Sequence, residues 1–427
     1  MPSLIFRILP LLALALSASP AFAEDELSAG DTAWMLTSTA LVLMMTLPGL
    51  ALFYGGLVRS KNVLSIFMQC MISAAMAGVV WIVVGYSLAF GEGNALVGDF
   101  SMFLLDGITP ESVSGTIPTY VFVMFQGMFA IITPALMLGA FAERMKFSAY
   151  LLFITIWLIV VYCPLAHMVW GGGFIGAKLG ALDFAGGLVV HMSSGYSALV
   201  AALVLGPRRG YGKEPMPPHN LPFAVIGAAM LWVGWFGFNA GSQLAADGTA
   251  GLAFITTNTA AAAAVLVWAL LEQLHHGKPT VLGAATAAVA GLVVITPACA
   301  FVTPVGALGV GGVGAAICYA AVAFLKPLFG YDDSLDVFGV HGVGGTWGAL
   351  ATGIFIADFA LPEGVTWLGQ LWIQTQSIVF VALFAPIATV AILYGLKALL
   401  GDLRVDEDAE YEGLDLAEHS ETAYAGD

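Results

Sequence analysis

The class of the fold is decided by residues 147–170, FSAYLLFITIWLIVVYCPLAHMVW, which contain no Asp, Glu, Lys or Arg. A helix needs about 20 predominantly apolar residues to cross the hydrocarbon core of a bilayer. The basic residues Arg144 and Lys146 stand directly before this stretch. We therefore predict a membrane-spanning helix that begins beside an aqueous phase.

The rest of the chain has the same character. Apolar residues make up 59% of the 427 residues and charged residues only 10%, whereas a soluble domain carries about 25% charged residues. So few charges cannot cover a water-facing surface, and the solvent around most of the chain must be lipid. We expect an all-α polytopic membrane protein with eleven transmembrane helices. Their expected ranges are 33–58, 63–90, 118–142, 147–170, 185–206, 221–241, 250–274, 280–297, 304–325, 336–357 and 368–400.

The first 23 residues predict a cleaved signal peptide rather than a span. Arg7 precedes a short apolar run at 8–18, and Ala21-Phe22-Ala23 has the small-x-small form of a cleavage site. Cleavage places the mature N-terminus outside the cytoplasm. We expect residues 24–400 to be a transmembrane domain of eleven helices in a bacterial inner membrane.

The basic residues give an independent indication of orientation. Beyond the signal peptide, eleven of the twelve Lys and Arg lie at or beyond the ends of odd-numbered spans, and Lys178 is the exception. Loops rich in Lys and Arg remain on the cytoplasmic side. The odd-numbered loops and the C-terminus are therefore predicted to be cytoplasmic, and the N-terminus periplasmic.

Residues 401–427 form a separate acidic tail with ten acidic residues and one arginine. Such a composition cannot bury a core of its own, which favours a solvated, partly disordered cytoplasmic tail. The alternative is docking onto basic loop residues, although exposed ion pairs contribute only about 0–1 kcal/mol each. Those basic residues are Arg144, Lys146, Arg208, Arg209 and Lys213.

Two histidines lie inside predicted spans, where ionisable side chains are costly and usually functional. His191 in span five and His341 in span ten share the pattern Val-His-x-x-x-Gly. An inverted duplication of five spans would place them in equivalent positions, as in many transporters. We favour a shared pore site over two structural histidines. We expect no metal site, because no third ligand occurs at a useful spacing.

Asp183 and several aromatic residues flank the same spans. Asp183 stands just before span five, where it can cap the helix or attract a cation at a pore mouth, and both roles stay open. Phe125 and Phe129 lie four residues apart on one helix face, Trp170 ends span four, and residues 235–242 close span six. Aromatic residues in membrane proteins mostly form interfacial belts, but their faces also bind cations.

Seven motifs follow one another along the chain. They are FQGMFAIIT (125–133), LGAFAER (138–144), AHMVWGGG (166–173), DFAGGLVVH (183–191), GWFGFNAGS (234–242), TPAC (296–299) and DVFGVHG (336–342). In this order, from about Asp31 into the tail, they resemble the ammonium transporter family (Amt/Mep/Rh), in its bacterial Amt branch.

The resemblance implies a fold and an outer site. The fold is an inverted five-plus-five repeat plus one long last helix, assembled as a homotrimer with one pore per subunit. Ammonium would be recruited on the periplasmic side by Phe125, Trp170 and Ser242, through cation–π contacts and one hydrogen bond. Phe129 and Phe238 would form a gate below that site.

The resemblance also assigns the polar residues. His191 and His341 would be twin histidines that line an apolar pore, and Asp183 would be the acid near the mouth that serves deprotonation. His167 receives no pore role and is interpreted as structural. The implied ligands are ammonium and methylammonium, and no cofactor or nucleic acid is implied.

A transport mechanism follows from the chemistry of ammonium. Potassium has a similar size, but only ammonium donates directional hydrogen bonds and can lose a proton. A narrow apolar lumen excludes a bare ion and admits neutral ammonia at much smaller cost. We therefore expect deprotonation outside, passage along the histidines and reprotonation inside.

Three other functions are alternatives to transport. An ammonium sensor would be favoured by an attached signalling domain, and an intramembrane enzyme by a nucleophile or metal set near the histidines; these residues contain neither pattern. A channel for another small neutral molecule is disfavoured by the cation–π site.

The tail carries one further resemblance. Glu412-Gly413-Leu414-Asp415, His419 and Tyr424 resemble the tails of bacterial family members that a PII-type nitrogen-signalling protein controls. A PII-type trimer at the cytoplasmic mouth is therefore a candidate partner.

Overall fold

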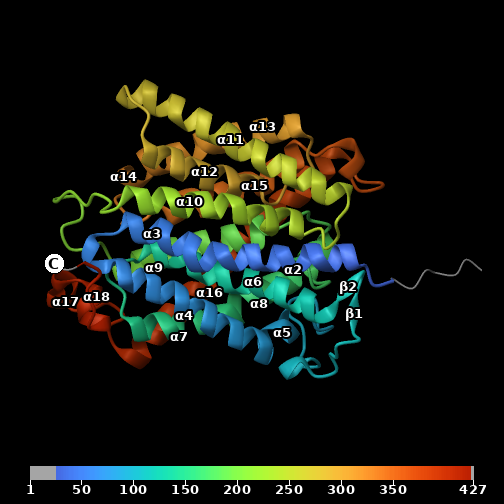
Figure 1. Cartoon of the computed structure of the whole chain (residues 1–427), viewed down its shortest axis with the longest axis horizontal. Helices are drawn as coiled ribbons and strands as arrows, with labels where there is room; N and C mark the ends of the chain where they lie inside the picture. The colour runs from blue at the N-terminus through green and yellow to red at the C-terminus, as the bar shows by residue number, and fades with distance from the viewer. Residues whose placement is uncertain (1–25, 425–427) are drawn as a thin grey trace, which may run out of the picture.

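The computed structural model describes residues 26–424, which form an almost entirely helical body (Figure 1). The predicted signal peptide, residues 1–23, lies outside the described residues. The long helices run side by side along the longest axis. The described chain begins at the end that carries the small hairpin of β1 (Val113–Ser114) and β2 (Ile117–Pro118). It finishes at the opposite end, beside α17 (Glu407–Glu412) and α18 (Leu414–His419).

In residues 26–424, nine helices are long and apolar enough to cross a membrane. They are Ala29–Leu57, Ser60–Phe90, Thr119–Ala140, Phe147–Leu179, Gly187–Leu205, Leu221–Ala240, Gly248–His276, Pro304–Phe329 and Trp367–Leu400. The eighth and tenth predicted ranges coincide with shorter helical segments, Val281–Ile295 and Phe338–Ile354. Large apolar side chains stay exposed along the outer helices, such as Leu266 at 72% and Ile387 at 66%, as expected for surfaces that face lipid.

The α-helical parts have the following bounds. They are α2 (Ala29–Met44), α3 (Ala51–Leu57), α4 (Val63–Val80), α5 (Tyr86–Phe90), α6 (Thr119–Met137), α7 (Phe147–Trp157), α8 (Cys163–Val169), α9 (Ser193–Leu205), α10 (Leu221–Trp235), α11 (Gly248–His276), α12 (Val281–Ile295), α13 (Pro304–Ala320), α14 (Lys326–Phe329), α15 (Val343–Ile354) and α16 (Trp367–Leu400).

Wide π-helical turns interrupt or open many of these helices. Three of them carry residues that the sequence singled out: Gly187–Met192 holds His191, Phe338–Gly342 holds His341, and Phe236–Ala240 holds Phe238. A π-turn shifts the side chains that follow it around the helix, and such turns occur frequently at functional sites. Hydropathy alone does not reveal them.

The two histidine-bearing helices cross at very close range. The helix α9 packs against Phe338–Gly342, and α15 packs against Gly187–Met192. A Cβ atom at Gly195 would lie only 2.1 Å from the backbone nitrogen of Gly342. Glycine is therefore required at this crossing, because any side chain would push the two helices apart.

The interpretation of residues 401–427 as a solvated, partly disordered tail is wrong for the described part, which ends at 424. Its backbone pairs with the loop before α7: the N–H of Lys146 donates to Leu403 O at 3.0 Å, and the N–H of Val405 donates to Arg144 O at 3.0 Å. Leu403 and Leu414 are each 1% exposed. The tail has no core of its own, but it completes the core of the cytoplasmic face predicted from the basic loops.

Candidate functional site

A cavity of about 410 Å³, named the outer cavity after the predicted topology, lies between α6, the end of α8 and the segment after Phe236–Ala240. Its lining residues are Phe90, Phe122, Gln126, Phe129, Val169, Trp170, Phe184, Ser242 and Leu244. Two of the predicted recruitment residues, Trp170 and Ser242, thus share one cavity. The third, Phe125, is not among the lining residues: it is fully buried and packs edge-on against Phe129, with ring centroids 5.1 Å apart.

Internal hydrogen bonds limit what Trp170 and Ser242 can offer to a ligand. The indole N–H of Trp170 donates to the backbone oxygen of Asp183 at 2.9 Å. The hydroxyl of Ser242 donates to the backbone oxygen of Phe238 at 2.8 Å. Because both hydrogens are engaged, a ligand can interact only with the aromatic face of Trp170 and with the lone pairs of the Ser242 hydroxyl oxygen. This combination suits a cation that donates hydrogen bonds.

Two phenyl rings close the floor of the outer cavity. Phe129 and Phe238 lie with their ring centroids 4.3 Å apart and their planes at 36°, and each is 1% exposed. The ring of Trp170 meets Phe129 edge-on at 5.9 Å. The pair that was predicted as a gate is therefore in contact and blocks the direct way inward.

The two predicted pore histidines lie directly below these rings and touch each other. Their Nδ1 atoms are 3.2 Å apart and their rings are stacked at 5.3 Å, although they are 150 residues apart in the sequence. His191 also stacks on Phe238 at 6.0 Å and on Trp235 at 5.6 Å. His191 and His341 are 1% and 3% exposed.

One hydrogen shared between the Nδ1 atoms fixes the tautomers of the neutral pair. One ring donates from Nδ1 and keeps a lone pair on Nε2, while the other accepts at Nδ1 and carries its hydrogen on Nε2. Within the described residues, Nε2 of His191 has no hydrogen-bond partner although it is buried. The pair therefore retains one acceptor and one donor that a small neutral molecule can use.

The apolar path continues past His341. A constriction of about 10 Å³ reaches from Phe238 to His341 and is lined almost entirely by apolar side chains. An inner cavity of about 190 Å³ begins on the other side of His341 and includes Tyr54, Ser334 and Asp336. Outer cavity, phenyl pair, histidine pair and inner cavity thus follow one another.

Asp183 caps the segment that carries His191. It is 6% exposed, and its carboxylate accepts four backbone N–H groups. These belong to Gly186 at 2.9 Å, Gly187 at 2.6 Å, Leu188 at 2.8 Å and Val189 at 3.2 Å. The capping interpretation is confirmed, and the mouth-acid interpretation stays a prediction.

His167 has a structural environment. Its Nδ1 lies 3.1 Å from Ala89 O and its Nε2 lies 2.6 Å from Asn94 O. It thereby ties the end of α8, just before Trp170, to the end of α5 and to the loop that follows it.

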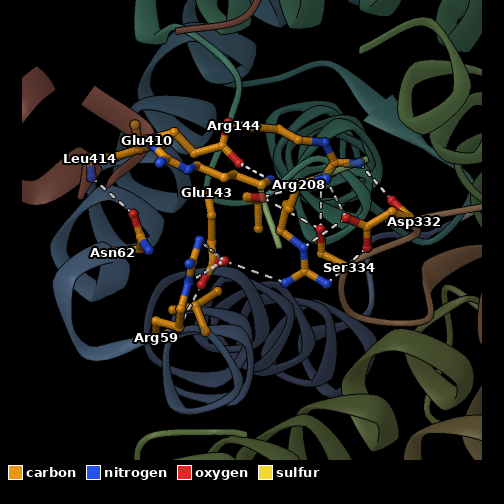
Figure 2. A network of polar contacts seen from close by, with 12 residues as sticks. Arg59, Asn62, Glu143, Arg144, Arg208, Asp332, Ser334, Glu410 and Leu414 are labelled. Carbon is orange, nitrogen blue, oxygen red and sulfur yellow. Dashed lines mark hydrogen bonds and ion pairs between the residues drawn. The ribbon is translucent and has the colours of Figure 1, made fainter. Parts of the chain in front are cut away.

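At the tail end of the molecule, buried charges tie several loops together (Figure 2). The carboxylate of Glu143 lies 2.7 Å from Arg59 and 3.4 Å from Arg208. Arg208 also forms a bidentate pair with Asp332, at 2.9 and 2.8 Å. Burial raises the pKa of Asp332, but the hydrogen bonds and charge of Arg208 outweigh it and hold that pKa below its usual value.

The side chains of two residues predicted to receive the tail belong to this network, although the backbone oxygen of Arg144 does accept a hydrogen bond from the tail. Arg208 is engaged as above, and Arg144 is fully buried and donates to four backbone oxygens and the hydroxyl of Ser334. Sequence reasoning missed Glu143 and Asp332, because their partners are far away in the chain.

The tail docks through its acidic side chains. Asp415 accepts the N–H groups of Leu64 and Ser65 at 3.0 and 2.7 Å and so caps α4. Glu410 accepts the N–H of Arg209 at 2.6 Å and forms an ion pair with Arg404 at 2.6 Å. The predicted docking of the tail is therefore confirmed, mostly through backbone groups rather than through exposed ion pairs.

Comparisons with known proteins give a consistent result. The sequence model of the Ammonium Transporter Family matches residues 33–424. An ammonium transporter of Bacillus subtilis is 50% identical over 402 residues, which cover 92% of this chain and 98% of that protein. The crystal structure of Saccharomyces cerevisiae Mep2 matches with a TM-score of 0.83 and 36% identity, covering 90% of this chain and 89% of that one. A solved sensor Amt protein matches with a TM-score of 0.86 and 30% identity, covering 91% and 98%.

Proposed function

Because this chain belongs to the ammonium transporter family, we propose that it carries ammonium across a bacterial inner membrane, with ammonia passing the pore as the neutral species. The observation that carries the proposal is the order in which cavities and side chains follow one another along one path. A cavity with an aromatic face and hydroxyl lone pairs leads to a closed phenyl pair and then to two touching, buried histidines.

The outer cavity recruits ammonium in this proposal. The Trp170 ring attracts the cation and Ser242 accepts one of its hydrogen bonds, since the hydroxyl hydrogen is already used. Phe125 acts indirectly, by packing behind Phe129. Phe129 and Phe238 move apart to admit the substrate.

Ammonium is deprotonated before the constriction, and the proton passes to a water molecule in the outer cavity. An ion without partners in so narrow and apolar a space pays several kcal/mol or more, whereas ammonia pays far less. The unpartnered Nε2 of His191 and the opposite nitrogen of His341 offer ammonia one acceptor and one donor. Asp183 supports the outer step through the negative charge of its carboxylate at the start of the segment that carries His191, while its backbone oxygen holds the indole of Trp170.

The proposed topology has eleven spans, with the N-terminus periplasmic and the C-terminus cytoplasmic. It is supported by the shorter helical segments Val281–Ile295 and Phe338–Ile354, which occupy the eighth and tenth predicted ranges. The described chain begins and finishes at opposite ends of the bundle, which fits an odd number of crossings (Figure 1). The homotrimer rests on the family alone.

A PII-type trimer is the proposed regulator. The docked tail places Asp415 and Leu414 beside the inner loops, where a partner could displace it. Capture of a PII-type protein by the full chain, and not by a chain stopped after Leu400, is the expected result of a pull-down. Equal capture by both chains excludes the tail as the binding element.

An ammonium sensor is a second candidate, because a solved sensor Amt protein is among the structural matches. Both candidates bind ammonium at the outer cavity, and they differ in flux. A sensor would bind ammonium with little charge or mass crossing the membrane.

The test uses purified protein in proteoliposomes on a solid-supported membrane, with labelled methylammonium uptake as a second readout. We expect ammonium to elicit flux that potassium does not reproduce. His191→Ala and His341→Ala should each abolish the flux or admit potassium, because both remove a polar partner from the apolar pore. His276→Ala, at an exposed histidine of α11, is the matched control. Normal uptake and potassium exclusion in both pore variants would refute the twin-histidine mechanism.

A further inference from the structure

The outer cavity contains a polar side chain that the recruitment site described above does not use. Among its lining residues, polar side-chain atoms belong to Gln126, Trp170 and Ser242. The hydrogens of Trp170 and Ser242 donate to backbone oxygens. The Gln126 amide has no hydrogen-bond partner within residues 26–424, although it is partly buried. It is the one uncommitted amide in this cavity.

The fold places Gln126 where a bound cation would meet it. Gln126 and Phe129 are three residues apart on α6, so their side chains lie on the same face of the helix. Both line the cavity, whereas Phe125 is turned into the core. Ser242 reaches the same cavity from the segment after Phe236–Ala240. Two oxygen acceptors thus approach the cavity from two separate elements.

Ammonium can use both acceptors at once. It has four N–H groups in a tetrahedron. An aromatic face attracts its charge, but accepts a directed hydrogen bond less strongly than an oxygen atom does. With Ser242 alone, most of its N–H groups would need water. An amide oxygen at Gln126 supplies a second fixed acceptor and leaves the Trp170 face for the remaining charge.

We propose that Gln126 is a specificity-determining residue of the outer site, which binds ammonium through its amide oxygen and favours it over methylammonium. This inference rests on the proposed transport function. Methylammonium has one N–H group fewer, and its methyl group gains nothing from an amide. Ammonium therefore depends on Gln126 more strongly than methylammonium does.

The experiment replaces Gln126 with methionine, which has a similar length but no oxygen. Currents from proteoliposomes are recorded against the concentration of ammonium and, separately, of methylammonium. We expect Gln126→Met to raise the KM for ammonium about tenfold, as for loss of a hydrogen bond to a charged group. The maximal current should change little, and the KM for methylammonium should rise less.

Two further variants keep the test decisive. Gln126→Glu retains an acceptor, so its KM for ammonium should stay at or below the wild-type value even if the methionine variant folds poorly. Gln243→Leu, at a glutamine outside the cavity lining, controls for loss of an amide on the same side. An unchanged KM in Gln126→Met, or equal shifts for both ions, overturns the inference. Absence of both ammonium-dependent current and labelled methylammonium uptake in the wild type overturns the proposed function instead.

Discussion

Replacing Asp183 by asparagine separates its two predicted roles, as a cap and as an acid at the pore mouth. The carboxylate accepts two N–H groups on each oxygen, those of Gly186 and Gly187 on Oδ1 and those of Leu188 and Val189 on Oδ2. Asparagine keeps one oxygen and places an NH2 group at the other position. Two backbone N–H groups then face a donor instead of an acceptor.

The expected loss of stability follows from that count. Each buried N–H group left without a partner costs about 1–3 kcal/mol, so Asp183→Asn should lower the free energy of unfolding by about 2–6 kcal/mol. Water has little access to replace the lost acceptor, since Asp183 is only 6% exposed. The half-buried Asp99, whose carboxylate accepts the backbone N–H and the hydroxyl of Ser101, provides the matched control Asp99→Asn.

The assay measures stability and uptake in the same preparations. Unfolding in mixed micelles of increasing SDS content, followed by tryptophan fluorescence, reports the free energy. Ammonium uptake is then normalised to folded protein. Wild-type stability of Asp183→Asn would refute the capping energetics. Wild-type uptake per folded molecule would leave Asp183 as a cap alone, whereas lost uptake in a folded variant supports a role for its charge.

Two further predictions concern packing and the tail. Gly195→Ala should strongly reduce uptake and lower thermal stability, because its methyl group would meet the Gly342 backbone at 2.1 Å and separate the histidines; Gly248→Ala, with nothing within 4 Å, is the control. Normal uptake by Gly195→Ala would show that the crossing tolerates expansion. Asp415→Asn should make the tail more sensitive to limited proteolysis, because it weakens the cap on α4, while the exposed Glu412→Gln should not. Equal cleavage rates for all three proteins would contradict tail docking through Asp415.

Sequence reasoning worked best where one physical effect dominates. Lipid solvation requires long apolar helices, and most predicted ranges coincide with helical segments to within a few residues, as 185–206 does with Gly187–Leu205. The histidine pair was also predictable, because a membrane makes an ionisable side chain conspicuous. The sequence predicted a shared site for the two histidines, but it did not predict that their Nδ1 atoms lie 3.2 Å apart.

The remaining features depend on distant partners or on local helix geometry. Hydropathy is the same for an α-turn and a π-turn, so the wide turns at His191, His341 and Phe238 were not foreseen. Phe125 and Phe129 share a helix face, yet a small rotation takes Phe125 out of the cavity lining. The order of the tail was not foreseen, because its few apolar residues pack against other segments. Its buried acids likewise accept hydrogen bonds from backbone N–H groups of those segments.

The structure adds a physical argument for a duplicated origin of the pore. In each half an acid stands eight residues before a histidine, at 183 and 191 and at 333 and 341. Asp183 accepts the first N–H groups of its helix, and Asp333 accepts the N–H of Phe338 at 2.7 Å. Each histidine lies on a π-turn that packs against the other half's helix. Chance similarity of a short motif does not require this reciprocity, whereas an inverted repeat with its site at the interface does.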